Sequence, residues 1–436
     1  MQTPVTLLAG ELGAGKTTLL SGLLESTDRD IAVVVNDVGA VNVDADLVEA
    51  RTTLETGEEV VALENGCICC SLGGELARSV VRLQRERAFD HLVIEASGIG
   101  EPEPIARQFV RGPAAGVYDL EAVVTVVDAR RFHDRFADDD ADTDVRPTRE
   151  GPDETDTRPL ADLVLEQVEF CDLLVVNKCD LVSDEERERV VALLETLQPR
   201  AEVLPTEYGA VDPDALLEPQ RFDLEAATDA AGWKQVLEDD TGHDHADSHE
   251  HDNGDSEHGD SEHSHGDTEH GHDEAREHDH AHPPEQYGIT VESYHRRRPL
   301  HPERFFGLLE DLPSELVRAK GLCWIAGRER QAITMSHAGT ETSLEVTGRW
   351  IASLSEQRRE TYRQGRSDLE WHEEWGDRET RLALIGRDLD VDALVDRFDD
   401  CLLTDDELEA DPSTFENRAP TGTNERVVVS SDDTPE

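Results

Sequence analysis

A glycine-rich segment near the start of the chain has the residue types and the spacing of a phosphate-binding loop, or P-loop. It follows a short apolar run at residues 5–9 and leads into an apolar-periodic stretch, so we expect a strand before the loop and a helix after it. In such a loop backbone N–H groups surround phosphate oxygens, while Lys16 can reach the β- and γ-phosphates and the Thr17 hydroxyl can bind Mg²⁺. The predicted nucleotide phosphate contacts are Gly10, Gly13, Ala14, Gly15, Lys16, Thr17 and Thr18.

A carboxylate that follows another apolar run is expected at the same site. Residues 92–94 are Leu-Val-Ile and predict a buried strand that ends in Glu95. At the carboxyl end of a strand beside the P-loop, Glu95 can hold the Mg²⁺ shell or orient a water, and Gly98 would let the backbone approach the γ-phosphate. We therefore predict Lys16, Thr17, Glu95 and Gly98 as the catalytic residues. The alternative is that Glu95 only ends an ordinary strand.

The segment Asn177-Lys178-Cys179-Asp180 follows an apolar run at residues 173–176 and can select the base of the nucleotide. A carboxylate two positions after a lysine accepts hydrogen bonds from guanine N1–H and its exocyclic amine, which adenine does not offer. Because a buried polar group left unpaired is costly, this discrimination is large. We predict GTP as the ligand, with Asn177, Lys178 and Asp180 as cofactor-binding residues.

Three cysteines gathered at Cys67, Cys69 and Cys70 predict a metal site. Thiolates suit a borderline-soft ion such as Zn²⁺, and Co²⁺ is equally compatible with this donor count. Three thiolates leave one tetrahedral position open, which suits transfer of the metal better than permanent structural binding. Buried inert cysteines or a labile vicinal pair are the alternatives.

Two aspartates after the second apolar run, Asp37 and Asp44, are weaker candidates as metal ligands. They fall where a nucleotide-dependent switch segment is expected, and they could complete the metal sphere or contact Mg²⁺. Since the chain has 99 acidic residues, plain solvated carboxylates are an equally good interpretation.

Histidines are concentrated between residues 243 and 282, which hold twelve of the 18 in the chain. Neutral imidazoles can bind Zn²⁺, Co²⁺ or Ni²⁺ in many interchangeable sets, which predicts weak buffering of metal. The alternative is a hydrophilic spacer with incidental histidines.

The elements that must position these residues predict two domains and two unstructured segments. Residues 1–215 alternate β-branched runs with helical stretches, which predicts an α/β domain with a mainly parallel sheet and an acidic loop at 137–162. The acidic, His-rich residues 238–284 predict a disordered linker. Residues 285–405 predict a smaller α+β domain, and residues 406–436 a disordered acidic tail.

Charge excludes some partners, because 41 basic and 99 acidic residues give a net charge of −58. Nucleic-acid affinity comes largely from Lys and Arg, so we expect no nucleic-acid partner. Only four basic residues are lysines, and we interpret this acidic surface as one suited to a high-salt cytoplasm. No apolar run approaches the roughly 20 residues that span a bilayer, so we expect a cytoplasmic protein without a membrane partner.

Together these motifs resemble the CobW family of metallochaperone GTPases, relatives of UreG and HypB. The resemblance covers residues 3–215 and 285–405 and includes two C-terminal segments, Arg318-Ala319-Lys320-Gly321 and Gly376-Asp377-Arg378. It implies a P-loop GTPase domain, a CobW C-terminal domain, slow GTP hydrolysis and delivery of Zn²⁺ or Co²⁺ to a client metalloprotein. Carried over, Cys67, Cys69 and Cys70 become the metal ligands, and Asn177 and Asp180 the guanine contacts.

One departure from the family lies in the switch segment, which usually reads Asn-Glu-Phe-Gly and is Asn36-Asp37-Val38-Gly39 here. Several functions stay open from the sequence. The client could be a zinc enzyme, or a cobaltochelatase if the protein delivers cobalt in cobalamin synthesis. A passive metal store and a P-loop kinase for a small molecule are the less favoured alternatives, and the oligomeric state stays open.

Overall fold

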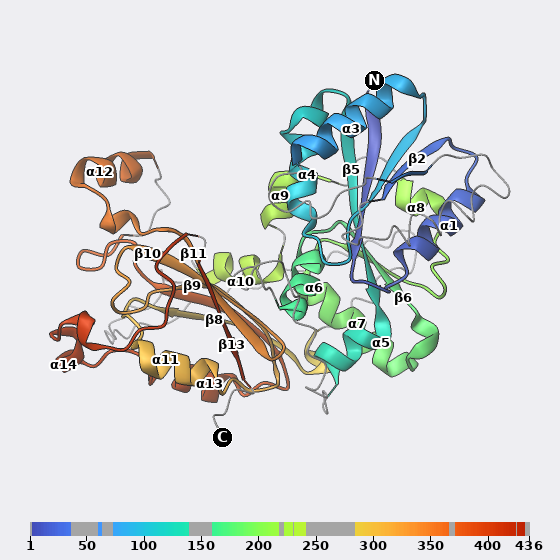
Figure 1. Ribbon diagram of the computed structural model, residues 1–436. Helices are drawn as coiled ribbons and strands as arrows, with labels where there is room; N and C mark the ends of the chain where they lie inside the picture. The colour runs from blue at the N-terminus through green and yellow to red at the C-terminus, as the bar shows by residue number, and fades with distance from the viewer. Residues whose placement is uncertain are drawn as a thin grey trace, which may run out of the picture.

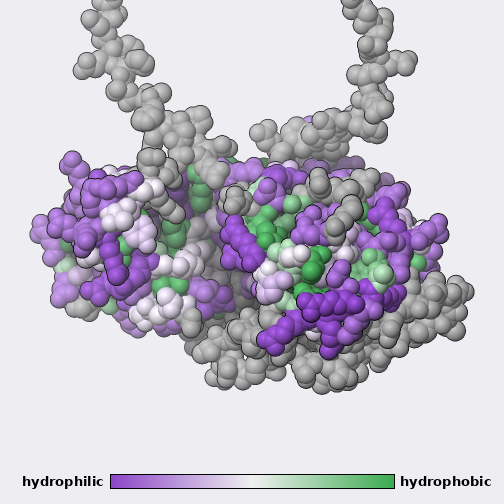
Figure 2. Space-filling view, turned by 90° about the horizontal axis from the view of Figure 1, so that it is seen from above, coloured by the Kyte–Doolittle hydropathy of each residue, from purple (hydrophilic) through white to green (hydrophobic). Residues whose placement is uncertain are grey.

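The computed structural model describes most of the chain and shows two sheets, each with its own helices (Figure 1). The described residues are 2–35, 60–62, 73–138, 159–217, 222–229, 231–240, 284–365, 371–423 and 425–431. The described surface seen from above is mainly hydrophilic, with apolar side chains in small patches (Figure 2). None of the described helices has the length and apolar character needed to cross a membrane.

The first sheet has seven strands in the order β3-β2-β4-β1-β5-β6-β7, and all neighbouring pairs are parallel. β2, β4 and β6 are buried along their whole length, because their short β-branched runs are apolar on both sides. The predicted α/β fold with a mainly parallel sheet is confirmed. The strands are β1 (Thr3–Gly10), β2 (Ile31–Val35), β3 (Val60–Ala62), β4 (His91–Glu95), β5 (Tyr118–Asp128), β6 (Leu173–Asn177) and β7 (Glu202–Pro205).

Helices cover both faces of this sheet. On one face α1 and α8 contribute Leu20 and Leu216 to the core, and on the other α3 and α6 contribute Leu76 and Leu165. The α-helices are α1 (Lys16–Ser26), α3 (Gly73–Glu86), α4 (Pro102–Val110), α5 (Ala129–Phe132), α6 (Leu160–Glu169), α7 (Asp184–Leu197), α8 (Pro213–Leu217), α9 (Leu224–Asp229) and α10 (Gly232–Asp240). Shorter turns are the 3-10 helices η1 (Pro113–Gly116) and η4 (Cys179–Leu181) and the π-helical turn η2 (His133–Ala137).

The second sheet has six strands in the order β13-β11-β10-β9-β12-β8, and all neighbouring pairs are antiparallel. Helices α11 (Pro302–Leu309) and α13 (Val391–Asp399) bury Phe305, Phe306 and Phe398 against one face of it. The predicted smaller α+β domain is confirmed. The remaining elements are β8 (Ile289–Arg296), β9 (Leu316–Cys323), β10 (Gln331–Ala338), β11 (Glu341–Arg349), α12 (Glu356–Gly365), β12 (Thr380–Arg387), α14 (Asp405–Leu408) and β13 (Arg426–Ser430), with 3-10 turns η5 (Pro284–Tyr287), η6 (Ile351–Ser353) and η7 (Pro412–Thr414).

The other face of the second sheet packs against the first domain, where Val317 joins that domain's apolar core. Beside it Arg318 is fully buried, and its Nε and Nη2 donate to the two carboxylate oxygens of Glu169 at 2.7 and 2.9 Å. Its Nη1 donates to Asp162 Oδ1 at 2.8 Å, and Lys320 Nζ donates to Glu169 Oε2 at 3.2 Å. A buried ion network therefore joins helix α6 to strand β9.

Two sequence predictions about unstructured segments need correction. The loop predicted at 137–162 ends too late, because α6 begins at Leu160 and Asp162 is buried in the domain contact. The tail predicted to be disordered from residue 406 contains β13, which pairs with β11 and buries Val429. Three consecutive valines, Val427 to Val429, supply the β propensity that the polar average composition of the tail conceals.

Two buried histidines predict a loss of stability at mildly acidic pH. His91 bonds with Thr6 Oγ1, while His337 bonds with Thr342 Oγ1 and the Leu316 carbonyl. Burial lowers the pKa of both from 6.5 to about 4, with smaller contributions from nearby arginines. Between these pH values the unfolded chain carries protons that the folded chain does not. The free energy of unfolding is therefore expected to fall as pH is lowered through this range, by up to about 3 kcal/mol per histidine.

Urea unfolding at a series of pH values checks this effect, with His91→Gln as the comparison. Glutamine cannot take up a proton in this range. The free energy of unfolding of the His91→Gln variant should therefore depend less steeply on pH than that of the unmodified chain. Equal slopes for the two proteins would show that His91 does not contribute.

Candidate nucleotide site

The P-loop joins strand β1 to helix α1, as the sequence predicted. Gly10 ends the strand, and Gly15, with φ 107°, stands just before the first helical residue, Lys16. The Lys16 side chain is buried, and its Nζ donates to the Gly10 carbonyl at 2.8 Å and to the Glu11 carbonyl at 3.2 Å. The ammonium group is thus held inside the loop by two backbone carbonyls.

Glycine is required at two points of this loop. Gly10 has φ 135°, and a Cβ there would lie 2.2 Å from the Val126 carbonyl oxygen. A Cβ on Gly15 would lie 2.3 Å from Asn177 Nδ2. Both residues are therefore fixed by a left-handed backbone and by a close neighbour.

Glu95 lies across from the start of α1, because β4 is the parallel neighbour of β1. Thr17 Oγ1 donates to Glu95 Oε1 at 3.3 Å, and Glu95 is 3% exposed. A hydroxyl and a carboxylate oxygen are hard donors of the kind that Mg²⁺ prefers. The loop after β4 also touches the P-loop, since a Cβ on Gly98 would lie 2.6 Å from the Leu12 nitrogen. The structure therefore brings together Lys16, Thr17, Glu95 and Gly98.

The Asn177–Asp180 segment braces the same loop. Asn177 Nδ2 donates to the Ala14 carbonyl at 2.9 Å, and Asn177 Oδ1 accepts from the Gly209 N–H at 2.9 Å. Lys178, in a left-handed conformation at φ 64°, donates from Nζ to the Gly13 carbonyl at 2.6 Å. Asp180 is exposed in η4 and is the member of this segment that is available to a base.

Two contributors to the site were not predicted from the sequence. Asp128 ends β5, is 2% exposed and accepts from Lys178 Nζ at 2.7 Å. Arg131 donates from Nη1 to the Leu12 carbonyl at 2.7 Å. The position of Asp128 at the carboxyl end of an apolar strand was the available signal, because parallel strands bring such ends together.

Helix α6 connects this site to the second domain. Gln167 Nε2 donates to the Gly100 carbonyl at 2.9 Å, within the loop that follows Glu95. Farther along the same helix, Glu169 binds Arg318 of the second sheet. One helix thus contacts both the loop beside the nucleotide site and the adjoining domain.

The predicted metal ligands Cys67, Cys69, Cys70, Asp37 and Asp44 lie outside the described residues. Four other cysteines are described, and all are buried with free thiols. Burial raises the pKa of each of these thiols, which opposes formation of the thiolate that binds metal. They are Cys171, Cys179, Cys323 and Cys401.

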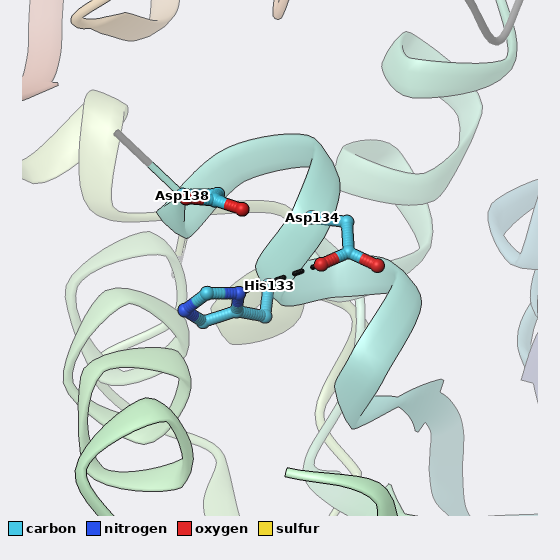
Figure 3. A group of neighbouring side chains, drawn as sticks. All are labelled: His133, Asp134 and Asp138. Carbon is cyan, nitrogen blue, oxygen red and sulfur yellow. Dashed lines mark ion pairs between the residues drawn. The ribbon is translucent and has the colours of Figure 1, made fainter. Parts of the chain in front are cut away.

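Among the described residues one group combines metal-ligating side chains: His133, Asp134 and Asp138 (Figure 3). Arg130 already occupies this group, because its Nη2 lies 3.0 Å from His133 Nδ1 and also binds Asp134. The hydrogen bond from Arg130 lowers the pKa of Asp134, and Arg130 also binds Glu186 at 2.9 Å. The cluster is an ion-pair network in which the guanidinium supplies the positive charge.

A parallel sheet whose central strand ends in this glycine-rich loop, with Thr17 and Glu95 facing each other, defines a P-loop nucleotide-binding protein. The chain belongs to the CobW family, as the resemblance predicted. Residues 4–205 match the family described as CobW/HypB/UreG, nucleotide-binding domain, and residues 289–402 match the cobalamin synthesis protein cobW C-terminal domain. It is therefore a member of a family of P-loop GTPases.

Known proteins of similar sequence or structure align with most or part of this chain. The "Zinc-regulated GTPase metalloprotein activator 1" of Dictyostelium discoideum is 32% identical over 434 residues, which cover 93% of this chain and 81% of that protein. The "Zinc chaperone CobW" of Sinorhizobium sp. is 35% identical over 184 residues, which cover 41% of this chain and 51% of that protein. The solved Zn(II)-bound YjiA GTPase from E. coli is 19% identical with a TM-score of 0.36, and the alignment covers 92% of this chain and 100% of that one.

Proposed function

We propose that the protein is a cytoplasmic GTP-dependent metallochaperone, which binds Zn²⁺ at Cys67, Cys69 and Cys70 and passes it to a client metalloprotein when GTP is hydrolysed. The observation that carries the proposal is the braced P-loop, in which Asn177 contacts the Ala14 carbonyl in a chain of the CobW family. The names of the similar proteins, which include a zinc chaperone and a zinc-regulated activator, support zinc as the cargo.

The proposed hydrolysis uses residues that already surround the loop. Lys16 would turn from the Gly10 and Glu11 carbonyls to the β- and γ-phosphates, because its Nζ lies within the loop. Thr17 and Glu95 would hold Mg²⁺, which neutralises the developing phosphate charge. Water would attack the γ-phosphorus while the bond to the bridging oxygen breaks, giving GDP and phosphate at a slow rate, as the family resemblance implies.

Sheet register supports a link between the nucleotide and the cysteines. Val35 in β2 pairs with Ala62 in β3 on one side and with Glu95 in β4 on the other. Neighbouring strands lie about 4.8 Å apart. The backbones of Ala62 and Glu95 are therefore roughly 10 Å apart, both at the carboxyl ends of their strands. Ala62, the last described residue before the cysteines, therefore ends its strand beside those that end in Val35 and Glu95, and Cys67 follows it by five residues in the sequence.

Zinc titration in different nucleotide states tests this function. A non-hydrolysable GTP analogue is expected to raise zinc affinity roughly 5- to 150-fold above that with GDP, which is the usual range of coupling between two sites. Cys67→Ala should abolish the tight, nucleotide-sensitive site. Competition with Co²⁺ in the same titration identifies the preferred metal and separates zinc delivery from cobalt delivery to a cobaltochelatase.

Deletion of residues 243–282 is the matched control, because it removes twelve histidines and leaves the cysteines in place. One tight site should survive in the deleted protein. Equal zinc affinity in all nucleotide states, with loss of binding after the deletion, would instead identify a passive metal store. ATP bound in preference to GTP would favour the small-molecule kinase.

A further inference from the structure

Three positively charged side chains hold three successive residues of the P-loop, in a chain whose net charge is −58. Each of them donates one hydrogen bond to the loop, and the three distances are 3.3, 2.7 and 2.6 Å. In the same order, the three contacts are Arg135 with the Glu11 carboxylate, Arg131 with the Leu12 carbonyl and Lys178 with the Gly13 carbonyl. Positive charge is therefore concentrated around the loop that is proposed to hold the phosphates.

Arg131 is the least committed of these three cations. Arg135 is paired with a carboxylate, Lys178 Nζ has a second partner in Asp128 Oδ2 at 2.7 Å, and their side chains are 22% and 29% exposed. The Arg131 side chain is 53% exposed, and its Nε lies 3.8 Å from Asp128 Oδ2. Within the described part of the chain, Arg131 Nη2 makes no hydrogen bond. The guanidinium can therefore turn at the cost of one hydrogen bond to a neutral carbonyl.

The Arg131 guanidinium lies between the P-loop and the base-reading segment. A Cβ on Gly13 would lie 3.2 Å from its Nη1 and 3.5 Å from its Nη2, so glycine leaves room for the guanidinium beside the loop. Asp128 Oδ1 accepts from the Arg131 N–H at 3.1 Å, while Asp128 Oδ2 accepts from Lys178 Nζ. A nucleotide with its phosphates in the loop and its base at Asp180 extends from one of these segments to the other. Arg131 therefore lies beside the path that the bound nucleotide would take.

We propose that Arg131 is a catalytic arginine of GTP hydrolysis, whose guanidinium leaves the Leu12 carbonyl and binds the γ-phosphate and the oxygen that bridges it to the β-phosphate. This inference rests on the proposed GTPase function and adds a residue to it. A planar guanidinium offers parallel N–H donors that match phosphate oxygens. An arginine supplied by the same chain can in this way stabilise the charge of the transition state.

The role of Arg131 in the reaction is electrostatic. The water oxygen forms a bond to the γ-phosphorus, and the bond from this phosphorus to the bridging oxygen breaks. The electron pair of the broken bond stays on GDP, and the proton lost by the water leaves with the phosphate or to solvent. Arg131 donates hydrogen bonds throughout and keeps its own proton. It therefore stabilises the negative charge that develops on the bridging oxygen.

Single-turnover hydrolysis of GTP by Arg131→Ala tests the inference. The rate should fall roughly 10- to 100-fold, while the affinity for GDP changes less than about threefold, because the arginine binds charge that develops only in the transition state. Arg131→Lys should recover only part of the rate, since an ammonium group lacks the planar fork. Arg397→Ala is the matched control, because Arg397 is also partly exposed and contacts Asp311 but lies in α13 of the second domain. Its rate should equal that of the unmodified protein.

Binding of GDP with aluminium fluoride, which mimics the transferring phosphoryl group, gives a readout that does not depend on turnover. Aluminium fluoride should tighten GDP binding by the unmodified protein about tenfold or more, and Arg131→Ala should lose this gain. An arginine that only braces the loop would instead weaken GDP binding equally with and without aluminium fluoride, which would overturn the inference.

Two outcomes separate the inference from the proposed function. Undiminished hydrolysis by Arg131→Ala, in a protein that Lys16→Ala inactivates, would overturn the inference alone. Absence of GTP hydrolysis by the unmodified protein would overturn the proposed GTPase function and the inference with it.

Discussion

Replacing Arg318 with alanine is expected to lower the free energy of unfolding by about 3–5 kcal/mol, the range seen when one partner of a buried ion pair is removed. Arg318 is fully buried, and the variant would leave Glu169 and Asp162 without its guanidinium. Burial alone would raise the pKa of Glu169, but the charges of Arg318 and Lys320 outweigh burial and lower it. Glu169 is therefore ionised at neutral pH, and its charge would lose its principal partner.

Urea unfolding followed by fluorescence measures this loss, and Arg296→Ala provides the matched control. Arg296 makes the same two-pronged contact with Asp399, at 2.7 and 2.8 Å, but its side chain is 38% exposed. Exposed ion pairs contribute little, so this variant should lose only about 1 kcal/mol. Similar losses for the two variants would show that burial of the domain contact does not determine its importance.

Replacing Lys16 with alanine is expected to reduce GTP hydrolysis on the order of 100- to 1,000-fold, because the site loses the charge that would meet the β- and γ-phosphates. The Lys16 ammonium is buried and lies at the Gly10 and Glu11 carbonyls, whereas Lys178 and Arg131 bind the Gly13 and Leu12 carbonyls farther along the loop. Phosphate release from GTP under single-turnover conditions measures the effect, with the unfolding midpoint recorded to verify the fold.

Lys234→Ala controls for loss of a lysine in a chain that has only four. Lys234 lies in α10 with its Nζ 5.4 Å from the centre of the Trp233 ring, away from the P-loop. Its GTP hydrolysis should match that of the unmodified protein. Undiminished hydrolysis by Lys16→Ala would rule out the P-loop as the site of the reaction.

The local sequence was sufficient to predict those parts of the fold that depend on residues close together in the chain. Apolar runs such as Leu173 to Val176 predicted buried parallel strands, because only a sheet covered on both faces accommodates them. The P-loop and Glu95 were likewise predictable, since a strand end followed by a characteristic motif determines their positions.

Contacts between distant residues were beyond prediction from one sequence. Arg318 pairs with Glu169 across 149 residues, and among 99 acidic residues no local pattern distinguishes that partner. Asp128 was missed although it ends an apolar strand, because its contact with Lys178 depends on the folding of the sheet. The strand β13 was missed because its valines lie in an acidic stretch whose average composition predicts disorder.

The two sheets differ in when they can be finished during synthesis. The last strand of the first sheet is Glu202–Pro205, so that sheet can assemble while the rest of the chain is still being made. The second sheet waits for Arg426–Ser430, and until then the outer edge of β11 has no neighbour from β13. An edge left open in this way can pair with other chains. The newly made second domain therefore keeps an open strand edge, available for contacts between molecules, until its last strand has been synthesised.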